Sequence, residues 1–422
     1  MPMQTTFVRF LRITLPLAGM NFLTQCARAG LAVVGPVLAV QYGFSASELG
    51  LLSAVMFAAY GLWQLPVGLL LDLYGPRRVQ SLMAMTAALG FVLFALADGL
   101  GGFVVARLVT GVGVAAGLTG MMKGNSQWFA RHQMAAVTGW GLLLGGLGGM
   151  AATMPVEALL PRIGWRGVFF AFAGIAVAVS AWNALSLRAP PGVAPPRKRL
   201  REEVGAIVAI LTARQFWRVT PMVCLLSVMN FTYQSLWAGP WLRDVAGFDA
   251  GLRARTLLFY ALGMMIGSAG WGMVASRLTA RGHSQMVVPW IGTILLMLAQ
   301  IVLMLVPQGP WAVSLVWTGF AALSSSGPTG YAAITATYPV ALMGRVATAI
   351  NAVMLATVFV LQASIGWILD LWPRAAGGGW DSRGYGWAIG VSLAMQIAAA
   401  AWALRPQRLR RGGEVRQGEA AS

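Results

Sequence analysis

Apolar residues occur along this chain in long runs that short polar segments separate. Twelve of these runs approach or exceed the roughly 20 residues that a helix needs to cross the hydrocarbon core of a bilayer. They cover residues 14–40, 51–71, 79–97, 101–124, 135–155, 167–187, 219–242, 256–275, 286–306, 311–333, 347–370 and 385–404. The pattern predicts an all-α membrane protein with twelve transmembrane helices.

A longer polar interruption divides the chain into two halves. It begins with four prolines between positions 190 and 196, which keep the sixth helix from continuing. Apolar residues then recur at helical spacing from Glu202 to Ala213, which indicates a helix on the membrane surface. We therefore expect four parts, namely a six-helix bundle (1–187), a cytoplasmic linker (188–218), a second six-helix bundle (219–404) and a basic cytoplasmic tail (405–422).

Composition and charge agree with a membrane protein and set its orientation. The 422 residues are 58% hydrophobic and 10% charged, against about 25% charged in soluble proteins, and the mean hydropathy is +0.71. The net charge of +18 does not indicate nucleic-acid binding, because the basic residues lie in short loops. Of 30 basic residues, 20 fall in segments on one face and eight at the other, so we expect both termini in the cytoplasm. We expect a multi-pass protein of a bacterial inner membrane.

The junction between the second and third runs carries a recognisable motif. Residues Gly68 to Arg78 read Gly-Leu-Leu-Leu-Asp-Leu-Tyr-Gly-Pro-Arg-Arg, which resembles the signature loop between helices two and three of the major facilitator superfamily. The family pattern is Gly-x-Leu-x-Asp-Arg-x-Gly-Arg-Lys/Arg-Arg/Lys, and the matching positions are Gly68, Leu70, Asp72, Gly75, Arg77 and Arg78. Leu73 and Pro76 depart from it.

The residue types of this motif also indicate a structural role, whatever family the chain belongs to. A carboxylate such as Asp72 is costly near hydrocarbon unless it meets a cation or a helix N-terminus, so we expect it to hold two segments together. Small Gly68 is expected to let another helix approach closely. The alternative is a basic turn on the cytoplasmic side with an incidental aspartate.

The resemblance implies a fold of two pseudo-symmetric six-helix bundles. Arg107, followed by Gly111 and Gly113, resembles the arginine-led motif of the family's fourth helix, and residues 272–282 form a degenerate copy of the signature loop. Such parallel repeats are the plan of the superfamily. The residues that the resemblance assigns to conformational switching are Gly68, Asp72, Gly75, Arg77, Arg78 and Arg107.

Arg28 is the most informative residue inside a span. It lies about 18 Å along the helix from Pro16, which places it near the bilayer midplane. No carboxylate falls inside another span, because Glu48, Asp98, Glu157 and Asp370 lie at or beyond outer span ends on this map. The missing partner is therefore expected to be an anionic substrate. The alternative is an arginine bonded to backbone carbonyls at a helix break.

Residues around Arg28 strengthen the anion interpretation. Asn21 and Gln25 precede it on the same helix face. Arg28-Ala29-Gly30-Leu31 resembles the Arg-x-x-Leu of first helices in organic-anion branches of the superfamily. The acidic residue that often precedes the arginine in those branches is replaced here by Ala27.

Other polar residues inside spans predict a polar cavity with aromatic walls. Lys123 is a further cation, which either contacts substrate or extends to the interface. The others are uncharged and recur at helical spacing, and each is open to a simpler role in an interhelical hydrogen bond. The full candidate substrate set is Asn21, Gln25, Arg28, Tyr60, Gln64, Lys123, Asn230, Tyr233, Gln234, Trp237, Asn351 and Gln362.

These features together predict a secondary transporter of a small, carboxylate-type anion that works by alternating access. A phosphate-binding loop for ATP is not readable, nor is a convergent set of catalytic residues, so we expect neither an enzyme nor a cofactor. Cys26, Cys224, His132 and His283 are scattered and predict no metal site.

Several alternatives stay open. One is a drug or metabolite efflux antiporter of the same superfamily, although the glycine run over residues 141–149 lacks the Gly-Pro pair of the antiporter motif. Another is a membrane scaffold or enzyme that does not transport. Coupling is either symport with a proton or exchange. The expected partners are the lipid bilayer and a small anion, with a proton as a candidate second solute, and we expect a monomer.

Overall fold

The computed structural model describes residues 7–130, 133–187, 200–339, 342–375 and 378–405, and the elements in these ranges are helices. In chain order they are η1 (Phe10–Thr14), α2 (Leu15–Tyr42), α3 (Ala46–Leu96), α4 (Leu100–Val114), α5 (Gly117–Trp128), α6 (Met134–Ala151), α7 (Met154–Ser186), α8 (Leu200–Thr212), α9 (Phe216–Thr232), η2 (Tyr233–Trp237), α10 (Ala238–Asp244), α11 (Ala250–Ala280), α12 (Val287–Met304), α13 (Pro310–Ser324), α14 (Gly327–Thr335), α15 (Met343–Leu369) and α16 (Ser382–Leu404). The elements η1 and η2 are single π-helical segments.

The twelve predicted crossings can be followed in these described helices. Eight helical stretches of the described chain, one of them α4 with α5, are long and apolar enough to span a membrane. One of the eight, α3, has 51 residues and contains two crossings, because Gly75 breaks its helical geometry with a φ of 75°. The helix α6, the series α9–η2–α10 and the pair α13–α14 supply the remaining crossings. The prediction of an all-α membrane protein is confirmed.

The two halves repeat a structural detail that their sequences hide. In the first half, the fourth crossing is interrupted between α4 and α5, at residues 115 and 116. In the second half, the tenth crossing is interrupted in the same way between α13 and α14, at Ser325 and Ser326. Corresponding helices of the two halves therefore break at corresponding places, as expected for two pseudo-symmetric bundles.

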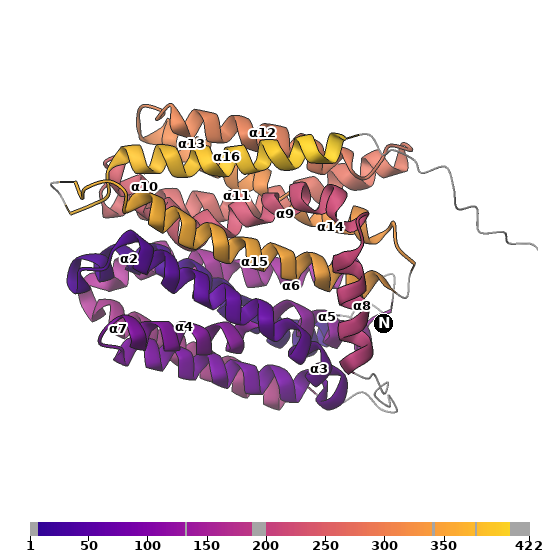
Figure 1. Ribbon diagram of the computed structural model, residues 1–422. Helices are drawn as coiled ribbons and strands as arrows, with labels where there is room; N and C mark the ends of the chain where they lie inside the picture. The colour runs from indigo at the N-terminus through magenta and orange to yellow at the C-terminus, as the bar shows by residue number, and fades with distance from the viewer. Residues whose placement is uncertain (1–6, 131–132, 188–199, 340–341, 376–377, 406–422) are drawn as a thin grey trace, which may run out of the picture.

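The helices run side by side, so the molecule has two ends (Figure 1). We call the end with α8, Arg77 and Arg78 the basic end, and the end with the α2–α3 turn the far end. In Figure 1 the first half, in indigo to magenta, fills the lower part and the second half fills the upper part, with α8 standing across the right-hand side. The basic end is at the right in this view.

The predicted linker is seen in part. The expected helix from Glu202 to Ala213 is present as α8 (Leu200–Thr212), and its Ile207 and Ile210 are buried. The proline-rich segment before it, residues 188–199, lies outside the described residues, as does most of the basic tail beyond Arg405.

Close contacts between the halves are concentrated toward the far end. A Cβ on Gly366 of α15 would lie 2.4 Å from the carbonyl oxygen of Ala46 at the start of α3. A Cβ on Gly239 of α10 would lie 2.4 Å from the carbonyl oxygen of Ala32 in α2. Glycine is therefore required at both positions for the backbones to approach this closely. The packing holds the two halves together on the far side of Arg28.

Candidate substrate site

Arg28 lies halfway along the first crossing and is buried. It is the fourteenth of the 28 residues of α2, and 7% of its surface is exposed. Its Nη1 donates to Oε1 of Gln25, one turn earlier, at 2.9 Å. Its Nη2 donates to Oε1 of Gln234 at 3.1 Å. Because Gln234 belongs to η2 of the second half, this bond joins the two halves at mid-depth.

Two phenylalanines form an apolar wall beside the guanidinium. The ring of Phe231 from α9 lies 3.5 Å from the Cζ atom of Arg28, and the ring of Phe57 from α3 lies 6.0 Å away. The two rings stack on each other with their centroids 6.2 Å apart. An aromatic face attracts a cation but does not neutralise it, so the net positive charge of Arg28 persists.

The partners of Arg28 leave its charge uncompensated. The described residues place no carboxylate in ion-pair contact with it, and both of its hydrogen bonds go to neutral amides. Two buried donors of this cluster, Nε of Arg28 and Nε2 of Gln234, have no hydrogen-bond partner. Each such donor costs about 1–3 kcal/mol when it stays unsatisfied. A bound anion would satisfy the donors and the charge together.

The structure adds a second buried guanidinium close to the first. The sequence map puts Arg107 near the outer face, whereas the structure buries it to 1% exposure in α4. Its Nη1 donates to the carbonyl oxygen of Ala27 and its Nε to that of Leu52, both at 2.9 Å, and its Nη2 has no partner. Because α4 starts at Leu100, Arg107 lies two turns inside the helix. Arg107 fixes the backbone beside Arg28.

The predicted polar stripe of the seventh crossing is divided by the π-helical segment η2. Gln234 reaches Arg28, whereas Tyr233 packs against Trp317 and Phe320 within the second half. Trp237 lies against Trp380, toward the far end. A π-helical segment changes the angle between successive side chains, so residues at α-helical spacing no longer share one face. The stripe therefore contributes Gln234, and not Tyr233 or Trp237, to the contacts of Arg28.

Hydroxyl groups complete the polar surroundings. The hydroxyl of Tyr260 in α11 donates to Oδ1 of Asn230 at 3.1 Å, and Tyr260 and Tyr60 both lie in the neighbourhood of Arg28. Gln64 donates to the carbonyl oxygen of Ala115 at the break between α4 and α5. Sequence reasoning missed Phe57, Phe231 and Tyr260, because a single aromatic residue in an apolar run resembles ordinary core.

Four of the candidate substrate residues lie in other contacts. Gln362 donates to Oγ of Ser235 at 2.6 Å, and Asn21 packs over Gly145 of α6, where a Cβ would lie 2.1 Å from its Nδ2. Asn351 is half-buried on α15, three turns toward the basic end from Gln362. Lys123 forms an ion pair with Asp72 near the basic end. None of these contacts is with Arg28.

The signature loop has the geometry that its residues require. Gly75 adopts a left-handed conformation with a φ of 75°, and Pro76 starts the next helix. Asp72 pairs with a cation, as predicted, and joins the second crossing to the fourth. The expected close approach at Gly68 was wrong, because a Cβ there would meet no atom within 4 Å. Arg77 and Arg78 are exposed at the basic end.

A buried positive centre at mid-depth, enclosed by two repeated helical bundles, is typical of membrane transport proteins. The sequence model of the Major Facilitator Superfamily matches residues 17–363. The chain belongs to this superfamily.

Curated relatives are similar to this chain over part of their length. A probable sulfoacetate transporter, SauU, of Cupriavidus necator is 23% identical over 62% of this chain and 64% of the relative. A probable L-galactonate transporter of Escherichia coli is 30% identical over 34% of this chain and 31% of the relative. A galacturonate transporter of Dickeya chrysanthemi is 28% identical over 34% and 41%. The chain thus covers less than two thirds of the length of each of these relatives.

Solved structures support the fold over nearly the whole chain. A bacterial homologue of the human lysosomal transporter Spinster superposes with a TM-score of 0.69 at 17% identity, over 92% of this chain and 95% of that one. The nucleoside transporter NupG superposes with a TM-score of 0.73 at 11% identity, over 93% and 99%. At these identities the likenesses show the fold alone, and this fold agrees with the family match.

Proposed function

We propose that the protein is a secondary transporter of small organic anions, with Arg28 as the group that binds the anionic end of the substrate. The observation that carries the proposal is the uncompensated charge of Arg28 at mid-depth. Its hydrogen bonds go to Gln25 and Gln234, and its Nε and the Nε2 of Gln234 are buried donors without partners. A carboxylate or sulfonate would accept from both donors in a charge-assisted, bidentate contact.

The rest of the cluster suits a small, hydroxylated or sulfonated acid. The amides of Gln25 and Gln234 and the hydroxyls of Tyr60 and Tyr260 offer both donors and acceptors around the guanidinium. Sulfoacetate, galactonate and galacturonate, which give their names to three of the similar transporters, have this chemistry. They are the first substrates to test.

The transport cycle is proposed to be alternating access by two halves, residues 1–187 and 219–404, joined by the linker 188–218. The bond between Arg28 and Gln234 gives both halves a share in the site, so substrate binding is coupled to their relative position. The far end is closed by contacts between the halves, and the Asp72–Lys123 pair lies within the first half near the basic end. The distribution of arginines favours a cytoplasmic basic end and a bacterial inner membrane.

Uptake into vesicles tests the function. The purified protein is reconstituted and counterflow of labelled sulfoacetate, galactonate, galacturonate, phosphate and a neutral sugar is measured. We expect saturable counterflow of at least one of the organic acids and none of the neutral sugar. Transport of the neutral sugar without any organic acid would overturn the proposal. Repeating uptake with and without a pH gradient then separates proton symport from exchange.

A further inference from the structure

The far end contains a set of polar contacts between the halves. Asp370, at the end of α15, accepts hydrogen bonds from the backbone N–H groups of Ala46 and Ser47 at 2.9 and 2.8 Å, so it caps the start of α3. Arg374 donates to the carbonyl oxygens of Gly43 and Phe44 at 3.2 and 2.7 Å. These contacts must break whenever the far end opens.

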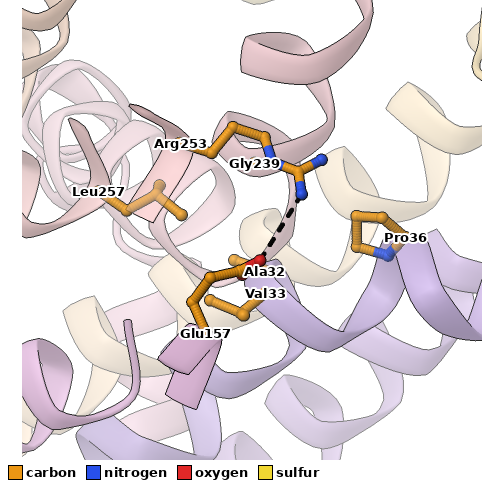
Figure 2. Close-up of a pocket in the computed structure, with 7 residues that line it drawn as sticks. All are labelled: Ala32, Val33, Pro36, Glu157, Gly239, Arg253 and Leu257. Carbon is orange, nitrogen blue, oxygen red and sulfur yellow. Dashed lines mark ion pairs between the residues drawn. The ribbon is translucent and has the colours of Figure 1, made fainter. Parts of the chain in front are cut away.

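One further contact between the halves lies deeper. Glu157, in the first turn of α7, forms an ion pair with Arg253 of α11, with 3.8 Å between Oε1 and Nη2. Figure 2 shows the two side chains pointing toward each other across a small pocket lined by Ala32, Val33, Pro36, Gly239 and Leu257. The side chains are 19% and 20% exposed, so the pair is largely withdrawn from water. Ala32 stands one turn, about 6 Å, beyond Arg28 on α2.

The sequence map put Glu157 at or beyond the outer end of the fifth span. The helical geometry of α7 continues from Met154 until Gly164, where φ is 66°. The segment from Met154 to Ile163 follows α6 after a turn at residues 152 and 153, and it places Glu157 against α11 and α2.

Glu157 differs from the other described carboxylates in how its charge is stabilised. Asp370 accepts two backbone hydrogen bonds, and Asp244 accepts from Arg243, from the hydroxyl of Tyr385 and from a backbone N–H. Glu48, Asp249 and Asp381 cap helices, and Asp72 and Asp98 have basic partners at hydrogen-bond distance. In the part of the chain that the structure describes, Glu157 accepts no hydrogen bond and has Arg253 as its sole charged partner.

These surroundings make the charge of Glu157 easy to neutralise. A largely buried carboxylate needs hydrogen bonds as well as an opposite charge to offset the loss of water. The elements packed against it supply little: α2 contributes apolar Ala32, Val33 and Pro36, α10 contributes Gly239, and α11 contributes Arg253 and Leu257. If Arg253 moves away with the second half, a carboxylate left in this pocket gains stability by taking up a proton.

We propose that Glu157 is the proton-carrying residue of the transport cycle. Its ion pair with Arg253 then marks the state in which Glu157 is deprotonated and the far end is closed. This inference rests on the proposed function of anion transport. When the far end opens, Arg253 separates and one proton from the far-side solution binds the Glu157 carboxylate. After closure with the anion on Arg28, that proton leaves to the water on the basic side, and the ion pair re-forms. One proton then crosses with each anion.

The test separates proton coupling from anion transport in the same vesicles. Wild type and Glu157→Gln are compared in two assays, counterflow of the labelled anion and its accumulation under a pH gradient, with a pH-sensitive dye reporting proton movement. We expect wild type to do both, and Glu157→Gln to keep counterflow but lose accumulation and proton movement. Glutamine is nearly isosteric with glutamate, so folding is preserved.

Matched variants complete the design. Asp98→Asn removes a carboxylate that pairs with exposed Arg166, and it is expected to keep full coupling. Arg253→Gln removes the other member of the pair and is expected to shift the pH dependence of accumulation. Undiminished accumulation by Glu157→Gln would overturn the inference. Accumulation of the anion by the wild type without any proton movement would also overturn the inference. The proposal of anion transport would then remain supported by the counterflow.

Discussion

Replacing Arg28 is the perturbation with the largest expected effect on substrate binding. In Arg28→Ala the anion loses the Nε donor and the charge but keeps the amide donor of Gln234, whereas in Arg28→Lys a point charge remains but the planar fork is gone. Gln25 and Gln234 keep their positions in α2 and η2, so the change is confined to the guanidinium.

The size of the effect follows from the geometry. The charge-assisted hydrogen bond that Nε would donate to a carboxylate is worth about 1.5–3 kcal/mol. Each 1.4 kcal/mol changes affinity about tenfold, so Arg28→Ala should weaken binding by about 10–100-fold. Arg28→Lys keeps the charge and should lose less than Arg28→Ala, about tenfold or less.

The assay is the shift in melting temperature on adding the transported anion, read together with counterflow. A ligand that binds the native state stabilises it by mass action, so the concentration dependence of the shift reports affinity. Arg281→Ala, which removes an exposed arginine at the basic end, is the matched control and should behave as wild type. Wild-type affinity in Arg28→Ala would refute the reasoning.

Three further predictions concern the conformational cycle and the division of the chain into two halves. Asp72→Asn should reduce the counterflow rate. It should lower the free energy of unfolding by about 1 kcal/mol or less, because the pair with Lys123 is partly exposed. An unchanged counterflow rate would show that the pair has no role in cycling. Gly366→Val adds a side chain where even a Cβ would lie 2.4 Å from a backbone oxygen, which destabilises the closed far end by about 1–3 kcal/mol. The variant should therefore favour the far-end-open state. This is measured by introducing Val33→Cys and labelling it with an impermeant maleimide. Gly272→Val, where a Cβ meets nothing within 4 Å, is its control, and equal labelling of the two variants would count against the far-end contacts. Inserting Gly-Ser after Pro195 should leave folded yield unchanged by size-exclusion chromatography, and loss of folded protein would show that the halves do not separate there.

The crossings and the central arginine could be predicted from the sequence because both signals are local. The length of an apolar run reports directly on bilayer thickness, and the position of Arg28 within its run gives its depth. Its contact with Gln25 follows from a spacing of three residues on one helix. The pairing of Asp72 with a cation follows from the cost of a carboxylate near hydrocarbon.

What could not be predicted depends on how distant segments pack. The bond from Arg28 to Gln234 joins residues 206 positions apart, and the π-helical segment η2 decides which residues of the stripe face the site. Phe231 is indistinguishable in sequence from other apolar residues, yet its ring covers Arg28. Hydropathy gave no sign of the ion pair of Glu157, because its partner Arg253 lies on a distant helix.

A structure of the protein with a transported organic acid bound is the most direct test of the central claim. The account predicts that the carboxylate or sulfonate oxygens lie about 3 Å from the guanidinium nitrogens of Arg28, with the amide of Gln234 as a further donor. It also predicts that Nε of Arg28 is no longer without a partner. An acid bound elsewhere, with Arg28 still held only by Gln25 and Gln234, would contradict the account.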